Sequence, residues 1–310
     1  MVSLRARLGR LFVWKVFNMN PDGGKSFAEV TDMVSDYSEE VKKGFVRTVE
    51  TTKSGIKFER IKPENTESEK LVLYIHGGGY TAGLSKAYRD QAVDYINAAN
   101  GAQCFLLDYT LSPEGKYPTQ HNEAYTFWKD VIDMGFKPEN IIVGGDSAGA
   151  NLTLSIMLRL RDEGATLPKA LYLISPWADM TASGDSYEKN YHVDPMFGKK
   201  GVELNEELRQ RLLDCDMYAW CGDANRKDPL VSPVFGDYKG FPTTLMTVGA
   251  DEILLSDTLT IEEKMKKEGI DVRVISHEKM FHIYPLYYTF FPESKKAYKQ
   301  ILAFVKEQMS

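Results

Sequence analysis

The sequence has few cysteines and no long apolar run. Three cysteines in 310 residues are too few for a disulfide scaffold. Cys215 and Cys221 have no Cys or His pair at zinc-like spacing. We therefore expect free thiols in a cytoplasmic, reducing compartment and no bound metal. No stretch approaches the roughly 20 apolar residues of a membrane-spanning helix, so stable membrane insertion is not expected.

Basic residues do not exceed acidic ones. The chain has 38 Lys and Arg against 44 Asp and Glu, a formal net charge of -6. Proteins that bind nucleic acid usually carry a basic stripe, so we expect no nucleic-acid partner. The hydrophobic content of 43% is high enough to offset the entropy of ordering the chain. The composition is therefore that of a folded, enzyme-sized globular protein.

Short apolar runs alternate with helix-length amphipathic stretches along most of the chain. This alternation predicts an α/β fold with about eight, mostly parallel strands and flanking helices. The first two runs are expected to form an antiparallel hairpin. The predicted strands are Phe45–Thr51, Ile56–Ile61, Leu71–Ile75, Ala102–Leu107, Ile141–Val143, Ala170–Ile174, Thr244–Val248 and Val272–Ile275. The predicted helices are Tyr88–Ala99, Asn122–Met134, Ala148–Glu163, Ser256–Lys267 and Ser294–Gln308.

Two segments do not fit the alternation. Residues 1–44 precede the first strand and have a helical pattern. Residues 179–239 exceed what a crossover between neighbouring strands needs, and the pattern over 204–220 predicts a helix there. We expect a catalytic core of residues 45–178 and 240–310. The N-terminal segment and the insertion are expected to form a helical cap that excludes water from a site.

The N-terminal segment mixes basic and apolar residues. Arg5, Arg7, Arg10 and Lys15 lie among leucines and aromatic residues. Lys15 interrupts the apolar run, which a signal peptide would keep continuous. We expect an amphipathic helix that packs on the protein itself, with contact to a membrane surface as the alternative.

The strongest motif is Gly145-Asp146-Ser147-Ala148-Gly149, between a predicted strand and a predicted helix. A sharp turn of this kind strains the serine and exposes its hydroxyl at the carboxyl end of the sheet. The dipole of the following helix favours negative charge there. Ser147 is therefore predicted to be a nucleophile. An idle serine in a glycine-rich turn is the alternative, because so short a motif also arises by chance.

A second motif, His76-Gly77-Gly78-Gly79, follows a predicted buried strand. Consecutive glycines cost conformational entropy, but without Cβ atoms their backbone N–H groups can approach a substrate oxyanion. The predicted oxyanion donors are the N–H groups of Gly78, Gly79 and Ala148. His76 is expected to hold the loop rather than to act as a base.

The two motifs, in this order, resemble those of the hormone-sensitive-lipase-like carboxylesterases, a family of α/β-hydrolases. Thr110 and Ala150 stand where that family usually has Arg and Gly. The resemblance extends over about residues 45–308 and implies the α/β-hydrolase fold, no cofactor and, often, a homodimer. Three further stretches support it: Asp108–Glu114, Ser175–Asp179 and Asp228–Pro233.

The other members of a catalytic triad should follow the serine in the order acid, histidine. Asp251 comes directly after a predicted strand and matches the acid position of the family. Asp257 is expected to cap the next helix instead. His282 lies on a loop after the last predicted strand, where the general base belongs. His277, at the end of that strand, is its rival.

The motifs together predict a serine carboxylesterase that hydrolyses short-chain acyl or acetyl esters through an acyl-enzyme on Ser147. The preference for short chains rests on the insertion 179–239, which is rich in charge and whose apolar residues are expected to roof a pocket but not to build a long tunnel. Two alternatives remain: a small-molecule receptor on the same fold, and an amide or peptide hydrolase with the same triad. The presence of His282 favours catalysis over a receptor.

Overall fold

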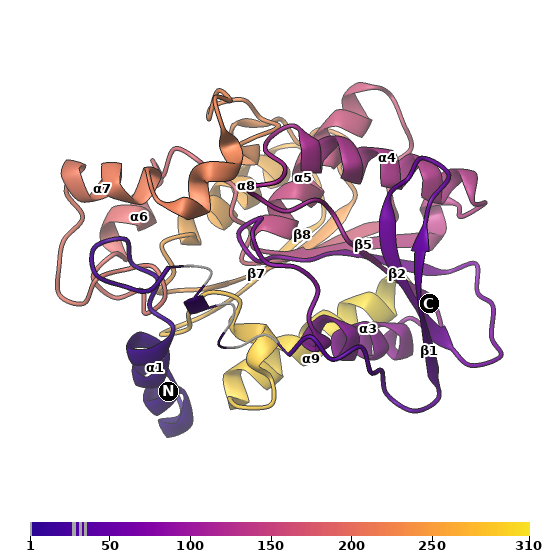
Figure 1. Cartoon of the computed structure of the whole chain (residues 1–310), viewed down its shortest axis with the longest axis horizontal. Helices are drawn as coiled ribbons and strands as arrows, with labels where there is room; N and C mark the ends of the chain where they lie inside the picture. Colours follow the sequence, from indigo (N-terminus) through magenta and orange to yellow (C-terminus); the bar gives the residue numbers. More distant parts are fainter. Residues whose placement is uncertain (1, 27–28, 31–32, 34–35) are drawn as a thin grey trace.

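The computed structural model describes residues 2–26, 29–30, 33 and 36–310. Its centre is an eight-stranded sheet with the order β1-β2-β4-β3-β5-β6-β7-β8 (Figure 1). The predicted fold class is confirmed, and each predicted strand is present within a few residues. The strands are β1 (Phe45–Thr51), β2 (Lys57–Pro63), β3 (Leu71–Ile75), β4 (Gln103–Leu107), β5 (Ile141–Asp146), β6 (Ala170–Ile174), β7 (Thr243–Gly249) and β8 (Val272–His277).

The sheet is parallel except at one edge. β1 and β2 form the predicted antiparallel hairpin, and β2 runs antiparallel to β4. From β4 across the sheet to β8, each strand is parallel to the next. Because all the parallel strands point the same way, their carboxyl ends meet at one edge, where α/β proteins place their sites.

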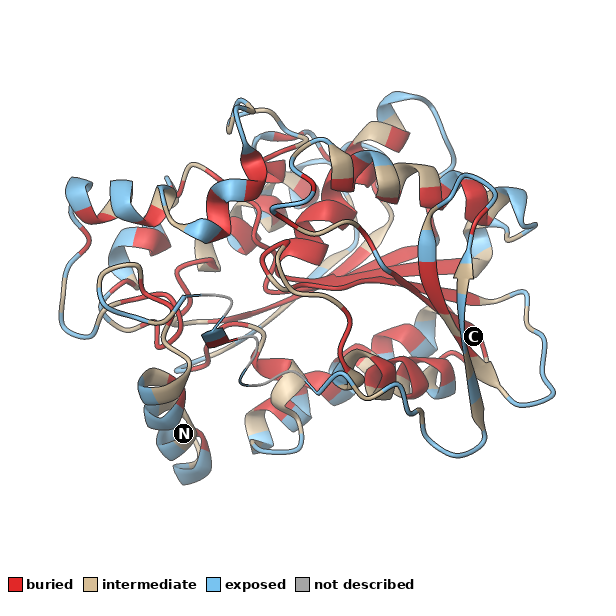
Figure 2. Cartoon of the chain, viewed as in Figure 1, coloured by how far each residue is buried: buried red, intermediate tan, exposed pale blue. Residues whose placement is uncertain are grey.

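Helices cover both faces of the sheet. α3 (Lys86–Ala98) and α9 (Pro292–Gln308) pack on one face, and α4 (Thr119–Asp133), α5 (Ala148–Asp162) and α8 (Leu255–Lys267) on the other (Figure 1). The central strands are therefore buried along their whole length (Figure 2). Burial on both faces explains why these strands are almost continuously apolar in sequence.

Residues 179–239 carry α6 (Asp185–Lys189), α7 (Glu206–Leu213) and the short 3-10 helices η2 (Asp216–Cys221) and η3 (Pro233–Phe235). Two further 3-10 helices lie elsewhere, η1 (Pro138–Asn140) and η4 (Tyr284–Tyr287). The prediction of one helix over 204–220 is wrong. The chain leaves the helix after Leu213 and is extended at Cys215, so that Met217, Tyr218 and Trp220 of η2 become buried.

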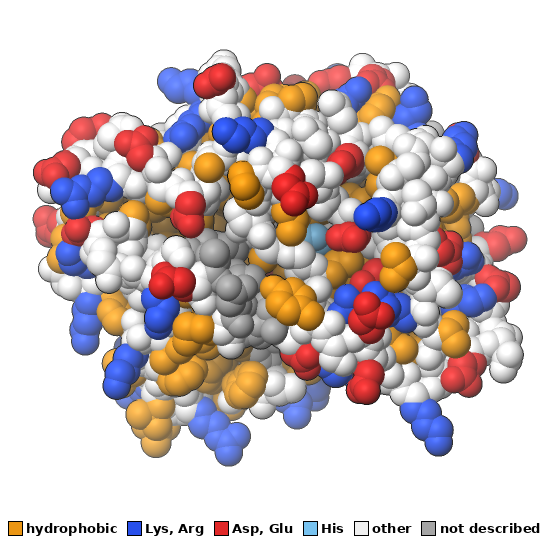
Figure 3. Space-filling model, in the orientation of Figure 1, with side chains coloured by type: hydrophobic (Ala, Val, Ile, Leu, Met, Phe, Trp, Pro, Cys, Tyr) orange, Lys and Arg blue, Asp and Glu red, His pale blue; other side chains and the backbone are white. Residues whose placement is uncertain are grey.

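The predicted N-terminal helix is present as α1 (Leu4–Val16). Its packed face is small: Ala6 and Val13 are buried, and Gly9 lies against the ring of Phe291. Its larger apolar side chains face outward, at the lower left of Figure 3. The chain that follows hydrogen-bonds to the insertion, from Met19 N to the carbonyl oxygen of Met196 at 2.6 Å.

Among the helices of the described residues, none combines the length and the apolar character that crossing a membrane requires.

Candidate active site

Ser147 occupies a sharp turn between β5 and α5. Its backbone has φ 51° and ψ -118°, a conformation that residues with a side chain rarely adopt. The turn depends on Gly149, because a Cβ there would lie 2.0 Å from the carbonyl oxygen of Ile75. The sequence motif thus produces the strained, helix-starting serine that was expected of it.

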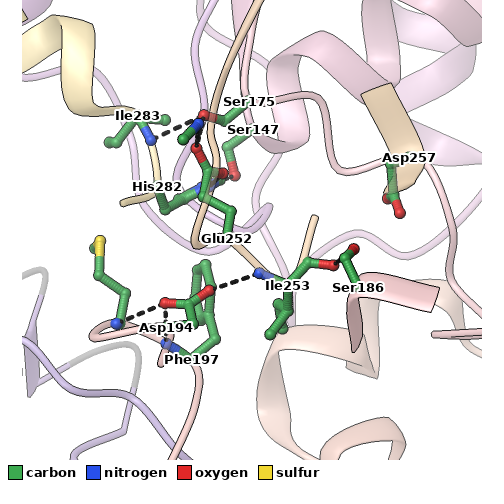
Figure 4. A network of polar contacts seen from close by, with 12 residues as sticks. Ser147, Ser175, Ser186, Asp194, Phe197, Glu252, Ile253, Asp257, His282 and Ile283 are labelled. Atoms are coloured by element: carbon green, nitrogen blue, oxygen red, sulfur yellow. Dashed lines mark hydrogen bonds and ion pairs between the residues drawn. The ribbon is translucent and has the colours of Figure 1, made fainter. Parts of the chain in front are cut away.

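His282 lies directly beside this serine. Its Nε2 is 2.9 Å from Ser147 Oγ, and its Nδ1 is 3.0 Å from Glu252 Oε2 (Figure 4). The ring of Phe197, from the insertion, packs edge-on against the imidazole at 4.9 Å between centroids. A hydroxyl, an imidazole and a carboxylate are therefore connected in one line, which is the geometry of a nucleophile activated by a general base.

The acid in this line is Glu252 and not Asp251, so the prediction for Asp251 is wrong. The Asp251 carboxylate faces away and pairs with Arg10 of α1 at 2.6 Å. β7 ends at Gly249 and the chain turns, so neighbouring residues point in different directions. Glu252 points toward the histidine, where Ser175 Oγ and the N–H of Gly249 donate to Oε1. The sequence signal that could have pointed to Glu252 is that it directly follows Asp251, so that two carboxylates stand side by side after this strand.

Glu252 is fully buried and held in place on several sides. Ser175 Oγ donates to it at 2.8 Å and accepts from the N–H of Ile283, the residue after the histidine. On the other side, Asp194 Oδ2 of the insertion accepts from the N–H of Ile253 at 2.8 Å (Figure 4). Burial raises the pKa of Asp194 to about 6. The insertion thus contributes directly to the position of the acid.

His277, the rival base, and Asp257, the expected helix cap, both lie outside the line of contacts from Ser147 to Glu252. His277 Nδ1 is 2.7 Å from the hydroxyl of Tyr284, and the imidazole beside Ser147 Oγ is that of His282. Asp257 is buried within the first turn of α8 and does not cap it, so that prediction is wrong. Its carboxylate accepts from the N–H groups of Ala178 and Asp179 instead and so ties α8 to the loop after β6.

The loop with three glycines lies beside Ser147. Asp146 Oδ1 accepts from the N–H of Gly77 at 2.9 Å, and Gly78 has φ 102°, which favours glycine. His76 is buried and stacks on Tyr109 at 4.3 Å between centroids. Burial lowers the pKa of His76 to about 4, so it is neutral at pH 7. It has the loop-holding surroundings expected of it.

Three backbone donors near the serine are available to a ligand. Within the described part of the chain, no residue accepts a hydrogen bond from the N–H of Gly78, Gly79 or Ala148. Gly78 and Gly79 line cavities that also contain Ser147. Such N–H groups can stabilise negative charge that develops on a substrate oxygen.

Ser147 lies between two cavities of very different size. The smaller has a volume of about 20 Å³ and the larger about 240 Å³. The smaller is lined by Gly79, Ser147, Trp177, Phe197, Leu212, Met217, Tyr218, Ile253 and Leu254. The larger is lined by His282 and, among others, Phe17, Met19, Gly78, Tyr88, Met196, Ile283, Leu286 and Tyr287. Both have mainly apolar walls, which suits the apolar parts of an ester.

No cluster of three or more His, Cys, Asp or Glu that could hold a metal ion exists among residues 2–26, 29–30, 33 and 36–310.

The chain matches the alpha/beta hydrolase fold over residues 72–286. It belongs to that family. An esterase of Acinetobacter venetianus is 31% identical over 81% of this chain and 79% of its own length. An acetyl-hydrolase of Streptomyces hygroscopicus is 30% identical over 80% of this chain and 79% of its own.

Solved structures show which group of α/β-hydrolases this chain resembles. An esterase of the bacterial hormone-sensitive lipase family superposes with a TM-score of 0.82 at 25% identity, over 100% of both chains. An esterase/lipase from an uncultured bacterium gives 0.83 at 27% identity over 99% of both. With the two glycine motifs, these comparisons make the chain a hormone-sensitive-lipase-like α/β-hydrolase, as its sequence indicates.

Proposed function

We propose that this α/β-hydrolase is a serine carboxylesterase that cleaves short-chain, above all acetyl, esters. The observation that carries the proposal is the line from Ser147 Oγ through His282 to Glu252, with contacts of 2.9 and 3.0 Å. The names of its relatives, esterase and acetyl-hydrolase, support the same reaction. A receptor on this fold would have no use for a base in contact with the serine.

In the proposed reaction, His282 Nε2 takes the proton of Ser147 as Oγ attacks the ester carbonyl carbon. Glu252 holds the imidazole through Nδ1 and stabilises its protonated form. The N–H groups of Gly78, Gly79 and Ala148 bind the tetrahedral oxyanion, and each such donor is typically worth about 3 kcal/mol. The C–O bond then breaks, and His282 returns the proton to the leaving alcohol. Water, deprotonated by the same histidine, hydrolyses the acyl-enzyme.

The two cavities give the substrate a direction. Because His282 must protonate the leaving oxygen, the alcohol lies on its side of the serine, in the larger cavity. The acyl group then points into the smaller cavity beside Trp177 and Met217. A volume of about 20 Å³ holds little more than one water-sized group, which suits an acetyl methyl.

Residues 1–44 and 179–239 act together as the cap in this proposal. Phe17 and Met19 from the first segment and Met196 and Phe197 from the second line the larger cavity. The hydrogen bond from Met19 N to Met196 O joins the two segments. Cys104, Cys215 and Cys221 are unpaired thiols, which is consistent with a cytoplasmic location.

The test uses a fluorophosphonate probe and p-nitrophenyl esters with the intact chain. We expect labelling and ester hydrolysis, both lost in Ser147→Ala. Ser155→Ala, a buried serine of the same helix, is the matched control and should retain both. Labelling that persists in Ser147→Ala would contradict the assignment of the nucleophile. Faster turnover of arylamides than of esters would make the protein an amidase instead.

A further inference from the structure

Helix α1 carries four large apolar side chains on the outside. The exposed fractions are 71% for Leu4, 59% for Leu8, 59% for Leu11 and 56% for Phe12. With 3.6 residues per turn, these four side chains occupy an arc of roughly 100°. Soluble helices normally turn such an arc toward the core. Here the core-facing side is the narrow one, formed by Ala6 and Val13.

Basic residues border this apolar arc. On the helical wheel, Arg5 and Arg7 fall on its two flanks, and Lys15 continues it toward the end of the helix. All three are exposed and, within the described part of the chain, none forms an ion pair. Arg10, by contrast, lies toward the inner side and pairs with Asp251. Figure 3 shows Lys and Arg side chains around the orange patch over α1.

An apolar strip with cationic flanks complements a surface that combines apolar chains with anionic headgroups. We propose that α1 docks in the interfacial plane of an anionic lipid membrane, with Leu4, Leu8, Leu11 and Phe12 among the acyl chains. Arg5, Arg7 and Lys15 would then meet the lipid phosphates. A second copy of this chain fits less well, because two-fold symmetry would place the cations of one helix beside those of the other.

The position of α1 would bring a docked membrane close to the cavity at Ser147. The chain leaves the helix at Phe17, and Phe17 and Met19 line the larger cavity at Ser147. A membrane beneath α1 would therefore lie next to the cavity assigned to the alcohol. Esters with apolar alcohols partition into membranes, so docking would bring the enzyme to such substrates. This consequence rests on the proposed function, whereas the docking itself does not.

The experiment measures co-sedimentation of the full chain with vesicles. The vesicles are phosphatidylcholine alone, or phosphatidylcholine with about 30% phosphatidylglycerol, at low and high salt. The test variants are Leu8→Ser with Leu11→Ser, and Arg5→Gln with Arg7→Gln. The control is Leu259→Ser, an exposed leucine of α8. The Ser147→Ala background is measured in parallel, so that binding is scored without catalysis.

We expect binding to the anionic vesicles that weakens with salt. Removing both arginines should weaken it about 25-fold, at about fivefold per cation. Removing both leucines should weaken it at least as much. Leu259→Ser should bind like the unchanged chain, and every variant with Ser147 should hydrolyse p-nitrophenyl acetate within about twofold of it.

Equal binding to neutral and anionic vesicles, or no loss in the leucine variant, would overturn the proposal. A dimer in solution that Leu8→Ser with Leu11→Ser converts to a monomer, without vesicle binding, would assign the face to a second copy. If the unchanged chain bound the vesicles but hydrolysed no p-nitrophenyl acetate, the result would count against the proposed function alone.

Discussion

Arg10 and Asp251 form an ion pair of 2.6 Å that connects α1 to the loop that carries Glu252. The same guanidinium donates to the carbonyl oxygen of Lys279, on the loop that leads to His282, at 3.2 Å. It also donates to the carbonyl oxygen of Val193, which precedes Asp194. One side chain thus joins the acid loop, the histidine loop and the insertion. It also holds Asp251 away from the imidazole.

Exchanging the two neighbouring acids tests which one serves the histidine. Glu252→Gln should lower kcat for p-nitrophenyl acetate by about 10³- to 10⁴-fold, because the imidazolium loses its counter-charge and the tautomer changes. Asp251→Asn should lower it less than about tenfold, since only the pair with Arg10 weakens. A larger loss in Asp251→Asn than in Glu252→Gln would return the acid role to Asp251.

Replacing Arg10 tests the link between α1 and the cavity. Arg10→Met leaves the Asp251 carboxylate and two carbonyl oxygens without their donor, a loss of about 2 kcal/mol for a charged hydrogen bond. The segment with Phe17 and Met19 should loosen. We therefore expect KM to rise about tenfold for esters of bulky alcohols, with kcat reduced less than about threefold.

The control for this prediction is Arg7→Met, an exposed arginine of the same helix, which should leave both constants unchanged. If Arg10→Met lowered kcat and left KM alone, Arg10 would act on the triad and not on the binding cavity.

The sequence predicted the parts of the site that depend on local backbone chemistry. The motif around Ser147 predicts a strained turn at the serine, and its glycines leave room for β3 to approach closely. His282 was recognisable from its loop after the last strand. These features are encoded within a few residues, so the strand pattern was enough to place them.

The direction in which a side chain points in the folded protein could not be predicted in this way. Asp251 and Glu252 share one turn, and only the path of the chain after β7 decides which carboxylate reaches the histidine. The apolar face of α1 was expected to pack on the protein, with a membrane surface as the alternative, but its leucines and Phe12 are exposed. Periodicity gives the width of an apolar face and not the side on which the protein lies. Cys215, which breaks the predicted cap helix, carries no breaker signal.

Glu59 on β2 should make stability depend on pH. It accepts bidentate hydrogen bonds from Arg47 and Arg89, and it is buried. Burial alone would raise the pKa of Glu59, but the two arginines outweigh burial and lower it from 4.5 to about 2. A lowered pKa means that the ionised form stabilises the fold above about pH 4.5. That stabilisation is lost as the pH falls toward 2.

Urea unfolding of the unchanged chain and of Glu59→Gln checks this. The variant should be less stable at pH 7 by at least about 2 kcal/mol, since two arginines lose their partner. The difference should shrink steadily below about pH 4.5. Glu139→Gln, an exposed glutamate, should show no such difference. A difference for Glu59→Gln that stays constant down to pH 3 would contradict the ionised pairing.

Met217 should set the length of the acyl chain. It lies on η2, is buried, and lines the cavity of about 20 Å³ assigned to the acyl group. An acetyl methyl fits this volume, whereas longer chains must displace side chains, at a typical cost of 1 to 3 kcal/mol for an overfilled core. We therefore expect kcat/KM for p-nitrophenyl acetate to exceed that for the hexanoate at least about fivefold.

Met217→Ala removes about three heavy atoms from the wall of this cavity and should admit about three more chain carbons. The optimum should move from acetate toward butyrate or hexanoate, and the gap between acetate and hexanoate should fall below about threefold. Leu286→Ala, in the larger cavity, is the matched control. It should leave the acyl ranking unchanged and alter the ranking of alcohols. If Leu286→Ala and not Met217→Ala changed the acyl optimum, the two cavities would hold the ester in the opposite direction.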